Sequence, residues 1–341
     1  MDLANISKDI IILVFGTILV TLISILLGLI FNGIDRKIYA AIKKEKNQSI
    51  IQPFKDIKQL FSQKSVVPNN CVSWIFNLMP TLSLATSISI ILFLPLGGIN
   101  PIISSGGDIL LILYLIILSP ILLIIGNFSN GNSKIIKQAH IDMENIIAYS
   151  FPLIVIILSI VWVLTQAELG EVFSISTIAG LQTNLAIWNY VEGPLGYIGL
   201  FILFAVFVIV ISSDIARMDI KLQDGKDNNS GYSGRNLAIV YMTYSSRTIV
   251  AASLITILFI PYNLTNFINI SGAYLSNTVD FVFFLLKIFL ITIIAFTAVR
   301  LIKSKIKTEQ ITYKYLVQLT LASLVGLILV MWDGTLMTLI S

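Results

Sequence analysis

The sequence has only one cysteine, Cys71, and only one histidine, His140, in 341 residues. A single cysteine cannot form an intramolecular disulfide, and it cannot supply the several thiolates of an iron–sulfur cluster or a structural zinc site. A single histidine excludes a haem held by two histidines of this chain and any metal site with several histidine ligands. We therefore expect no metal and no cofactor in this chain, and any redox chemistry nearby must belong to a partner.

Charged residues are also scarce. They make up 12% of the chain, whereas soluble domains average about 25%. Hydrophobic residues make up 56%, and the mean hydropathy is +0.92. This composition excludes an ordinary water-soluble enzyme, a disordered chain, collagen and a coiled coil. The chain also has no glycine-rich nucleotide loop and no usable Ser-His-Asp set. What remains is an all-α polytopic membrane protein.

Long apolar runs predict about eight transmembrane helices in a single integral membrane domain, residues 1–341. A hydrocarbon core of about 30 Å needs about 20 apolar residues per helix. The windows that meet this requirement are residues 10–31, 73–94, 109–126, 146–164, 195–212, 236–260, 279–300 and 314–332. The first run is too long for the apolar part of a secretory signal, so we expect no cleavable leader.

The basic residues alternate between the connections. Nineteen of the 22 Lys and Arg residues follow the first, third, fifth and seventh spans, and the other connections have none. The positive-inside rule then predicts cytoplasmic odd-numbered loops and outside termini in a cell membrane. The basic loops lack the interleaved aromatic residues suited to nucleic acid. We therefore expect them to meet the headgroups of the lipid bilayer, and no nucleic acid.

The first loop, residues 32–72, contains an amphipathic segment. Ile50, Phe54, Ile57 and Phe61 recur at helical spacing, and polar residues occupy the opposite side. Such a segment can lie in the headgroup plane with its apolar face down. A short connecting helix packed on the bundle is the simpler interpretation, and the two are compatible.

Two basic residues interrupt apolar spans: Arg247 in the sixth and Lys287 in the seventh. A charge at the bilayer centre costs about 2.5–3.5 kcal/mol on insertion scales, so both side chains should face the bundle interior or water. Asp280 lies seven residues before Lys287, on the same helix face. For Lys287 we weigh a structural ion pair or hydrogen bond to a neighbouring helix against a role in charge transfer.

Two further charged groups lie beside span ends. Asp214, Arg217 and Asp219 follow the fifth span, and Asp142 and Glu144 precede the fourth. If the helix continues past the fifth span, Asp214 and Arg217 share one face because they are three residues apart. For the charged group after the fifth span, a solvated loop is the simpler interpretation.

Five short motifs together resemble a known family. They are Asp35-Arg36-Lys37, Gln52-Pro53 with Asp56 and Leu60-Phe61, Ala148-Tyr149-Ser150-Phe151-Pro152, Asp214-x-x-Arg217, and Tyr232-Ser233-Gly234. Their order and positions, with the long basic first loop and the eight spans, are similar to subunit 1 of respiratory complex I. They also resemble its counterparts in membrane-bound energy-converting nickel–iron hydrogenases.

The resemblance implies a non-catalytic membrane subunit that couples electron transfer in partner proteins to H⁺ or Na⁺ movement. The implied partners are hydrophilic iron–sulfur and hydrogenase-large-subunit-like proteins and antiporter-like membrane subunits. Iron–sulfur and nickel–iron centres are expected only in those partners. The candidate residues for ion coupling or subunit contact are Asp214, Arg217, Asp219, Asp35, Arg36, Asp142, Glu144, Arg247 and Lys287.

The chain departs from the family pattern at several positions. Ser150 stands where the family has Glu, and Tyr244 stands where the sixth span normally carries Glu. A serine cannot hold and release a proton as a carboxylate does. These departures favour the hydrogenase branch over a quinone-reducing complex I. Three alternatives stay open: subunit 1 of a quinone-reducing dehydrogenase, a stand-alone solute permease, and an anchor that has lost coupling.

Overall fold

The computed structural model describes residues 3–44, 49–68, 70–97, 99–103, 107–180, 186–223, 231–268, 272–303 and 314–340. Within these ranges, side chains are not described for residues 3–13, 216–223, 266, 273, 300, 302–303, 314–316 and 334–340. The described residues are almost entirely helical and contain no named strand. The predicted class, an all-α polytopic membrane protein, is confirmed.

The helices follow one another with short connections. They are α1 (Leu3–Lys43), α2 (Gln52–Ser62), α3 (Ser73–Phe93), α4 (Ile109–Phe128), α5 (Ser133–Gln166), α6 (Ile175–Ile178), η1 (Ile187–Tyr190), α7 (Pro194–Gln223), α8 (Gly234–Phe259), η2 (Leu264–Asn266), α9 (Ala273–Ile291), η3 (Thr292–Phe296), α10 (Thr297–Lys303), η4 (Lys314–Leu319) and α12 (Thr320–Ile340). Both η3 and η4 are π-helical turns, and η3 joins α9 to α10 in one continuous rod.

Among the described residues, seven helices are long and apolar enough to cross a membrane. They coincide with the first seven predicted spans, and the eighth coincides with a shorter apolar helix, Val317–Asp333. Helices α1, α5 and α7 continue well past their predicted apolar windows. Hydropathy marks only the part of a helix that lipid favours. The charged groups expected in loops beside these spans therefore lie on helices.

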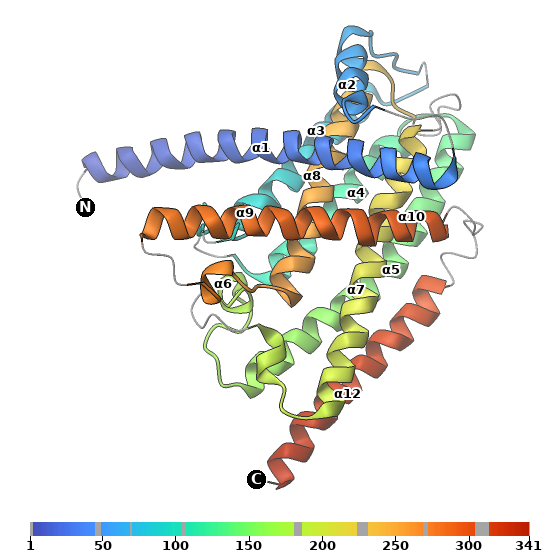
Figure 1. Cartoon of the computed structure of the whole chain (residues 1–341). Coiled ribbons are helices and arrows are strands. Elements are labelled where there is room, and N and C mark those ends of the chain that lie inside the picture. Colours follow the sequence, from blue (N-terminus) through green and yellow to red (C-terminus); the bar gives the residue numbers. More distant parts are fainter. Residues whose placement is uncertain are drawn as a thin grey trace.

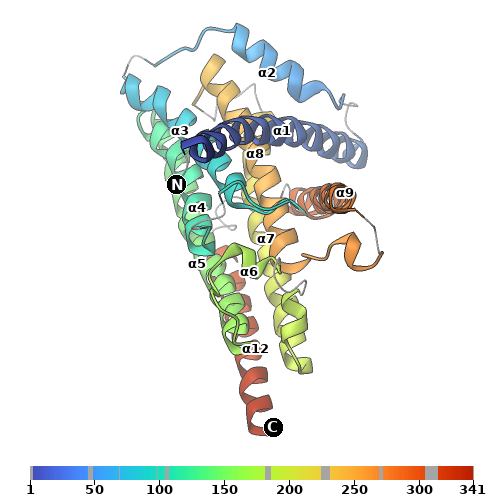
Figure 2. The same ribbon diagram turned by 90° about the vertical axis from the view of Figure 1, so that its left-hand side faces the viewer.

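Helix α8 is the centre of the molecule. It packs against α1, α2, α3, α7 and α9, and almost all of its residues are buried. In Figure 1, α1 and the α9–α10 rod run across α8, while α3, α4, α5 and α7 run more nearly along it. Figure 2 shows α12 beside α5 and α7, with its C-terminal end extending beyond the other helices. A polar helix is tolerated here because protein surrounds it on every side.

Helix α1 approaches α8 closely at a glycine. A Cβ at Gly28 would lie 2.2 Å from the carbonyl oxygen of Ser245, so no larger residue fits. One turn further along α1, the Asn32 amide donates to the Ser245 hydroxyl at 3.4 Å and accepts from the Thr248 hydroxyl at 3.1 Å. These hydrogen bonds satisfy polar groups that neither lipid nor apolar side chains could satisfy.

The amphipathic segment of the first loop forms α2. Pro53, at the first turn, is buried, as suits a residue whose missing N–H is not needed there. Ile57 and Leu60 pack against the core, whereas Phe61 is 47% exposed. The predicted helix is confirmed, and it packs on α8 and α1. Its exposed apolar edge is also consistent with a position at the bilayer surface.

The segment before α8 ties together two distant parts of the chain. The Tyr232 hydroxyl donates to the carbonyl of Leu123 in α4 at 3.0 Å. The Ser233 hydroxyl accepts from the Val66 N–H at 3.0 Å and donates to the Val66 carbonyl at 3.2 Å. Burial, with a smaller contribution from the nearby Cys71, raises the pKa of Tyr232 well above its ordinary value. The hydroxyl therefore stays a proton donor.

Candidate functional site

A buried ion pair joins helices α7 and α8 in the core of the molecule. The Arg247 guanidinium, on α8, donates through Nη2 to Oδ2 of Asp214, on α7. Each residue is only 7% exposed. Taking two charges out of water is costly, and removing either partner leaves the other charge uncompensated. The pair is therefore stable only while both groups stay charged.

Small polar residues surround both members of the pair in the sequence. Ser212 and Ser213 precede the aspartate, and Ser246 and Thr248 flank the arginine. All four side chains are buried.

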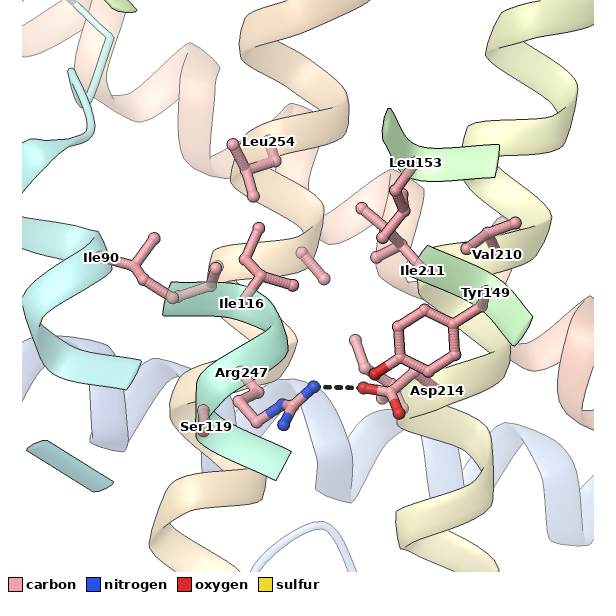
Figure 3. Close-up of a pocket in the computed structure, with 13 residues that line it drawn as sticks. Ile90, Ile116, Ser119, Tyr149, Leu153, Val210, Ile211, Asp214, Arg247 and Leu254 are labelled. Carbon is pink, nitrogen blue, oxygen red and sulfur yellow. Dashed lines mark hydrogen bonds and ion pairs between the residues drawn. The ribbon is translucent and has the colours of Figure 1, made fainter. Parts of the chain in front are cut away.

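A cavity of about 30 Å³ lies beside the pair, among α3, α4, α5, α7 and α8. Figure 3 shows Ile90, Leu153, Val210, Ile211 and Leu254 on its apolar side, and Ser119, Tyr149, Asp214 and Arg247 gathered at its other end. One buried water needs about 10–15 Å³ and a few polar partners. The cavity therefore has the size and the polar groups to hold water next to the ion pair.

The arginine retains hydrogen-bonding capacity at this cavity. Its Nη1 is buried and has no hydrogen-bond partner among the described residues. Buried polar groups in proteins are nearly always satisfied, so an orphaned N–H donor beside a cavity indicates a bound acceptor such as water. The Tyr149 hydroxyl points toward the Asp214 carboxylate (Figure 3). The guanidinium, the carboxylate and the phenol thus offer polar partners to water in the cavity.

Serines hold one wall of the cavity in place. The Ser83 hydroxyl, on α3, donates to the carbonyl of Ser119, on α4, at 2.7 Å, and the hydroxyls of Ser87 and Ser119 lie 2.9 Å apart. All three are buried. Pro120, which follows Ser119, has no N–H to donate within its helix. The serine contacts join α3 and α4 where the proline interrupts the helical hydrogen bonds.

Asp35 and Arg36, adjacent on α1, face different partners. The Thr297 hydroxyl, at the start of α10, donates to Asp35, which is 5% exposed. Arg36 pairs with Asp56 of α2 at 3.7 Å, and the Gln52 amide donates to the same aspartate at 2.7 Å. Neither Asp35 nor Arg36 lines the cavity. They attach α10 and α2 to α1.

The remaining acidic candidates differ in their surroundings. Asp142, on α5, is buried and accepts from the Gln138 amide at 3.2 Å, whereas Glu144 is exposed. Arg217 and Asp219 lie on α7, but their side chains are outside the described part of the chain. The helix continues past the fifth span through these residues. A solvated loop is wrong for Asp214, which is buried.

Lys287, on α9, lies away from the cavity and contacts the C-terminal end of α8. Its Nζ donates to the carbonyls of Ile260 at 2.9 Å and Tyr262 at 2.8 Å. Asp280, one of the buried residues, accepts from the backbone N–H of Thr265 at 3.0 Å and from its hydroxyl. Of the two interpretations of Lys287, this geometry is the hydrogen bond to a neighbouring segment, and its role in charge transfer stays a prediction.

Three residues that line the cavity or hold a helix end were not among the candidates predicted from the sequence. Ser119 and Tyr149 line the cavity. Asp333, on α12, is 6% exposed and accepts from the backbone N–H of Gly193 at 3.0 Å. It lies just past the last predicted span, so the rule that flags ionisable residues in spans misses it by one position. Among the described residues, no group of three or more His, Cys, Asp or Glu could hold a metal ion.

A family model described as NADH dehydrogenase matches residues 15–331, nearly the whole chain. The chain belongs to this family. The matched range contains the ion pair and every residue that lines the cavity, and Asp333 lies two residues beyond it. The family to which the five motifs pointed is confirmed.

Curated relatives within this NADH dehydrogenase family include components of several complexes. Hydrogenase-4 component C of Escherichia coli (strain K12) is 25% identical over 280 residues, which cover 80% of this chain and 82% of the relative. Formate hydrogenlyase subunit 4 of the same organism is 23% identical, covering 68% and 73%. One subunit of the NADH-quinone oxidoreductase of Carboxydothermus hydrogenoformans is 22% identical, covering 62% of this chain and 58% of the relative.

The fold also matches a solved structure. A chain of the membrane-bound sulfane sulfur reductase, an archaeal respiratory membrane complex, superposes with a TM-score of 0.76. The match covers 93% of this chain and 99% of that chain at 19% identity. At this identity the likeness shows the shared fold alone.

Proposed function

We propose that this protein is the membrane-anchoring and ion-coupling subunit of an energy-converting, hydrogenase-like oxidoreductase complex. The observation that carries the proposal is the buried Asp214–Arg247 pair on the wall of a cavity with room for water. Family membership and the hydrogenase subunits among the relatives support it. They do not favour a stand-alone permease.

The pair works as a two-state element in this proposal. An ion or proton that neutralises Asp214 removes the partner of Arg247 and leaves a buried, unpaired positive charge. That state is costly unless the charge outside the pair changes at the same time. A redox event in a docked partner changes the local potential and shifts the proton affinity of the carboxylate, which couples the two processes. Water in the cavity carries the proton or hydrates the ion.

The proposed partners are hydrophilic iron–sulfur and hydrogenase-large-subunit-like proteins, together with antiporter-like membrane subunits. The iron–sulfur and nickel–iron centres belong to those partners. The proposed location is the cell membrane, with the basic connections in the cytoplasm and both termini outside. The concentration of Lys and Arg in the odd-numbered connections supports this orientation.

The test uses the complex purified from native membranes, with its subunits identified first. Recovery of this chain without any iron–sulfur or hydrogenase-like subunit would contradict the proposal. Reconstituted into proteoliposomes, the Asp214→Asn complex should keep electron transfer and lose most of its ion movement, because the amide cannot bind and release a proton or balance a cation.

The matched control is Glu192→Gln, which removes one carboxylate from an exposed position. It should leave both activities unchanged. If Asp214→Asn assembles normally and moves ions as the parent complex does, the chain is an inert anchor and the proposal fails.

A further inference from the structure

The first turn of α7 is held by a buried carboxylate from another helix. Asp333 of α12 accepts from the N–H of Gly193 at 3.0 Å, and its negative charge sits at the positive end of the α7 dipole. A Cβ at Gly193 would lie 2.0 Å from one carboxylate oxygen, and a Cβ at Gly196 would lie 2.6 Å from the other. A Cβ at either position would displace the carboxylate, and one at Gly196 would also meet Val191.

The last turn of α8 is held in the complementary way. The positive charge of Lys287, which is 9% exposed, sits at the negative end of the α8 dipole and binds the carbonyls of Ile260 and Tyr262. The Trp188 indole N–H donates to the carbonyl of Phe259 at 2.6 Å. Three carbonyls at this helix end thus have side-chain donors.

These two anchors act on the two helices that carry the ion pair. Figure 1 places the start of α7 and the end of α8 toward the same end of the molecule, since the two helices run in opposite directions. Along the helix axes, Asp214 is about 30 Å from the first anchor and Arg247 about 20 Å from the second. A slip of α7 by one residue would move Asp214 by about 1.5 Å and rotate it by about 100°. Such a slip would separate the pair.

We propose that Asp333 and Lys287 are positioning residues that fix the register of α7 against α8, so that Asp214 and Arg247 meet. Their link to ion coupling rests on the function proposed above, but the register itself does not. Each charged group binds backbone groups at a helix end.

The contact between α7 and α12 does not depend on the carboxylate alone. A Cβ at Gly199 would lie 2.8 Å from the carbonyl oxygen of Gly326, and Gly326 also meets Leu203. This close packing keeps the helices together when Asp333 is replaced. Loss of the carboxylate should then let α7 slide and rotate along α12 within a folded molecule.

The experiment measures the α7–α8 register directly in the intact complex. Spin labels are placed at Phe201, an exposed residue of α7, and at Arg235, an exposed residue of α8, with Cys71→Ser as background. Pulsed electron paramagnetic resonance then gives the distance between labels that lie toward opposite ends of the antiparallel pair. This distance changes almost one for one when one helix slides along the other.

We expect Asp333→Leu and Lys287→Met to shift the mean distance by about 1.5 Å or more and to broaden its distribution. Asp333→Asn keeps an acceptor for Gly193, and Lys287→Arg keeps a charged donor, so both should restore most of the parent distribution. The matched control Glu192→Gln, next to the same helix start but exposed, should change nothing. Should Asp333→Leu fail to assemble, the smaller Asp333→Ala takes its place.

An unchanged distance in both the Asp333 and the Lys287→Met variants overturns the positioning role. A shifted distance with parent-level ion movement upholds the positioning role and contradicts the coupling function of the pair. A shifted distance with reduced ion movement supports both.

Discussion

Two sites on the α7–α8 pair treat buried charge differently. Within the helices, Asp214 and Arg247 neutralise each other beside a cavity, and one guanidinium nitrogen has no partner among the described residues. At one end of the helix pair, Asp333 and Lys287 each bind backbone groups at a helix terminus. A pair of opposite side-chain charges can be broken by a single protonation. A charge set against a helix end has a partner that never titrates.

In the proposed function, this difference separates a pair that can switch from contacts that hold its helices in position. The cavity, the orphaned donor and the nearby Tyr149 hydroxyl all lie beside the pair. At the helix ends, the Asp333 carboxylate packs closely against Gly193 and Gly196. The Lys287 ammonium group binds two backbone carbonyls. Three substitutions test this contrast by their cost to stability.

The largest effect is expected for Arg247→Met. It leaves Asp214 buried without its counter-charge, which costs about 3–5 kcal/mol. The measurement is the free energy or midpoint of unfolding of the purified complex in detergent. The double variant Arg247→Met with Asp214→Leu should recover most of the loss, because it removes both charges. A double variant as unstable as the single one would show that the arginine contributes chiefly by packing.

A smaller effect is expected for Lys287→Met. It deprives the carbonyls of Ile260 and Tyr262 of their donor. Both residues are only half-buried, so water replaces the donor in part and we expect a total loss of about 1–3 kcal/mol. Hydrogen exchange should increase in the last turn of α8. Lys287→Arg serves as the control. A loss equal to that of Arg247→Met would contradict the proposed distinction between the ion pair and the helix-end contacts.

The smallest effect is expected for Asp56→Asn, which removes the charge from the pair with Arg36. The Asp56 side chain is 25% exposed, and a pair at such a site contributes about 0–1 kcal/mol. The amide still accepts from Gln52. The loss should shrink further as salt is added, because exposed charges are screened. A large loss of stability that does not depend on salt would show that this pair behaves like the buried Asp214–Arg247 pair.

Much of the fold could be predicted from the sequence because lipid imposes a simple pattern. Apolar windows located every long helix, and the spacing of Ile57, Leu60 and their neighbours located α2. The windows could not give the ends of α1, α5 and α7. Where a helix leaves the hydrocarbon core, its residues become polar while its backbone hydrogen bonds continue, so composition changes before structure does.

Less of the site could be predicted. The cost of an intramembrane charge marked Arg247 as a residue that must face the interior, and the structure places it there. Its partner could not be chosen from the sequence, because Asp214 was expected beyond the end of a helix. The Asp333–Gly193 contact joins residues 140 positions apart, and no local pattern encodes it.

The burial of α8 has a consequence for how the protein is made. It is the least hydrophobic of the seven spanning helices, it carries Arg247 near its middle, and its neighbours cover it almost completely. Such a segment partitions poorly into lipid by itself. It becomes stable in the bilayer only once α1, α3 and α7, all made earlier on the ribosome, are there to receive it. The helices made earlier must therefore remain loosely packed in the bilayer until α8, the sixth long helix, has been inserted.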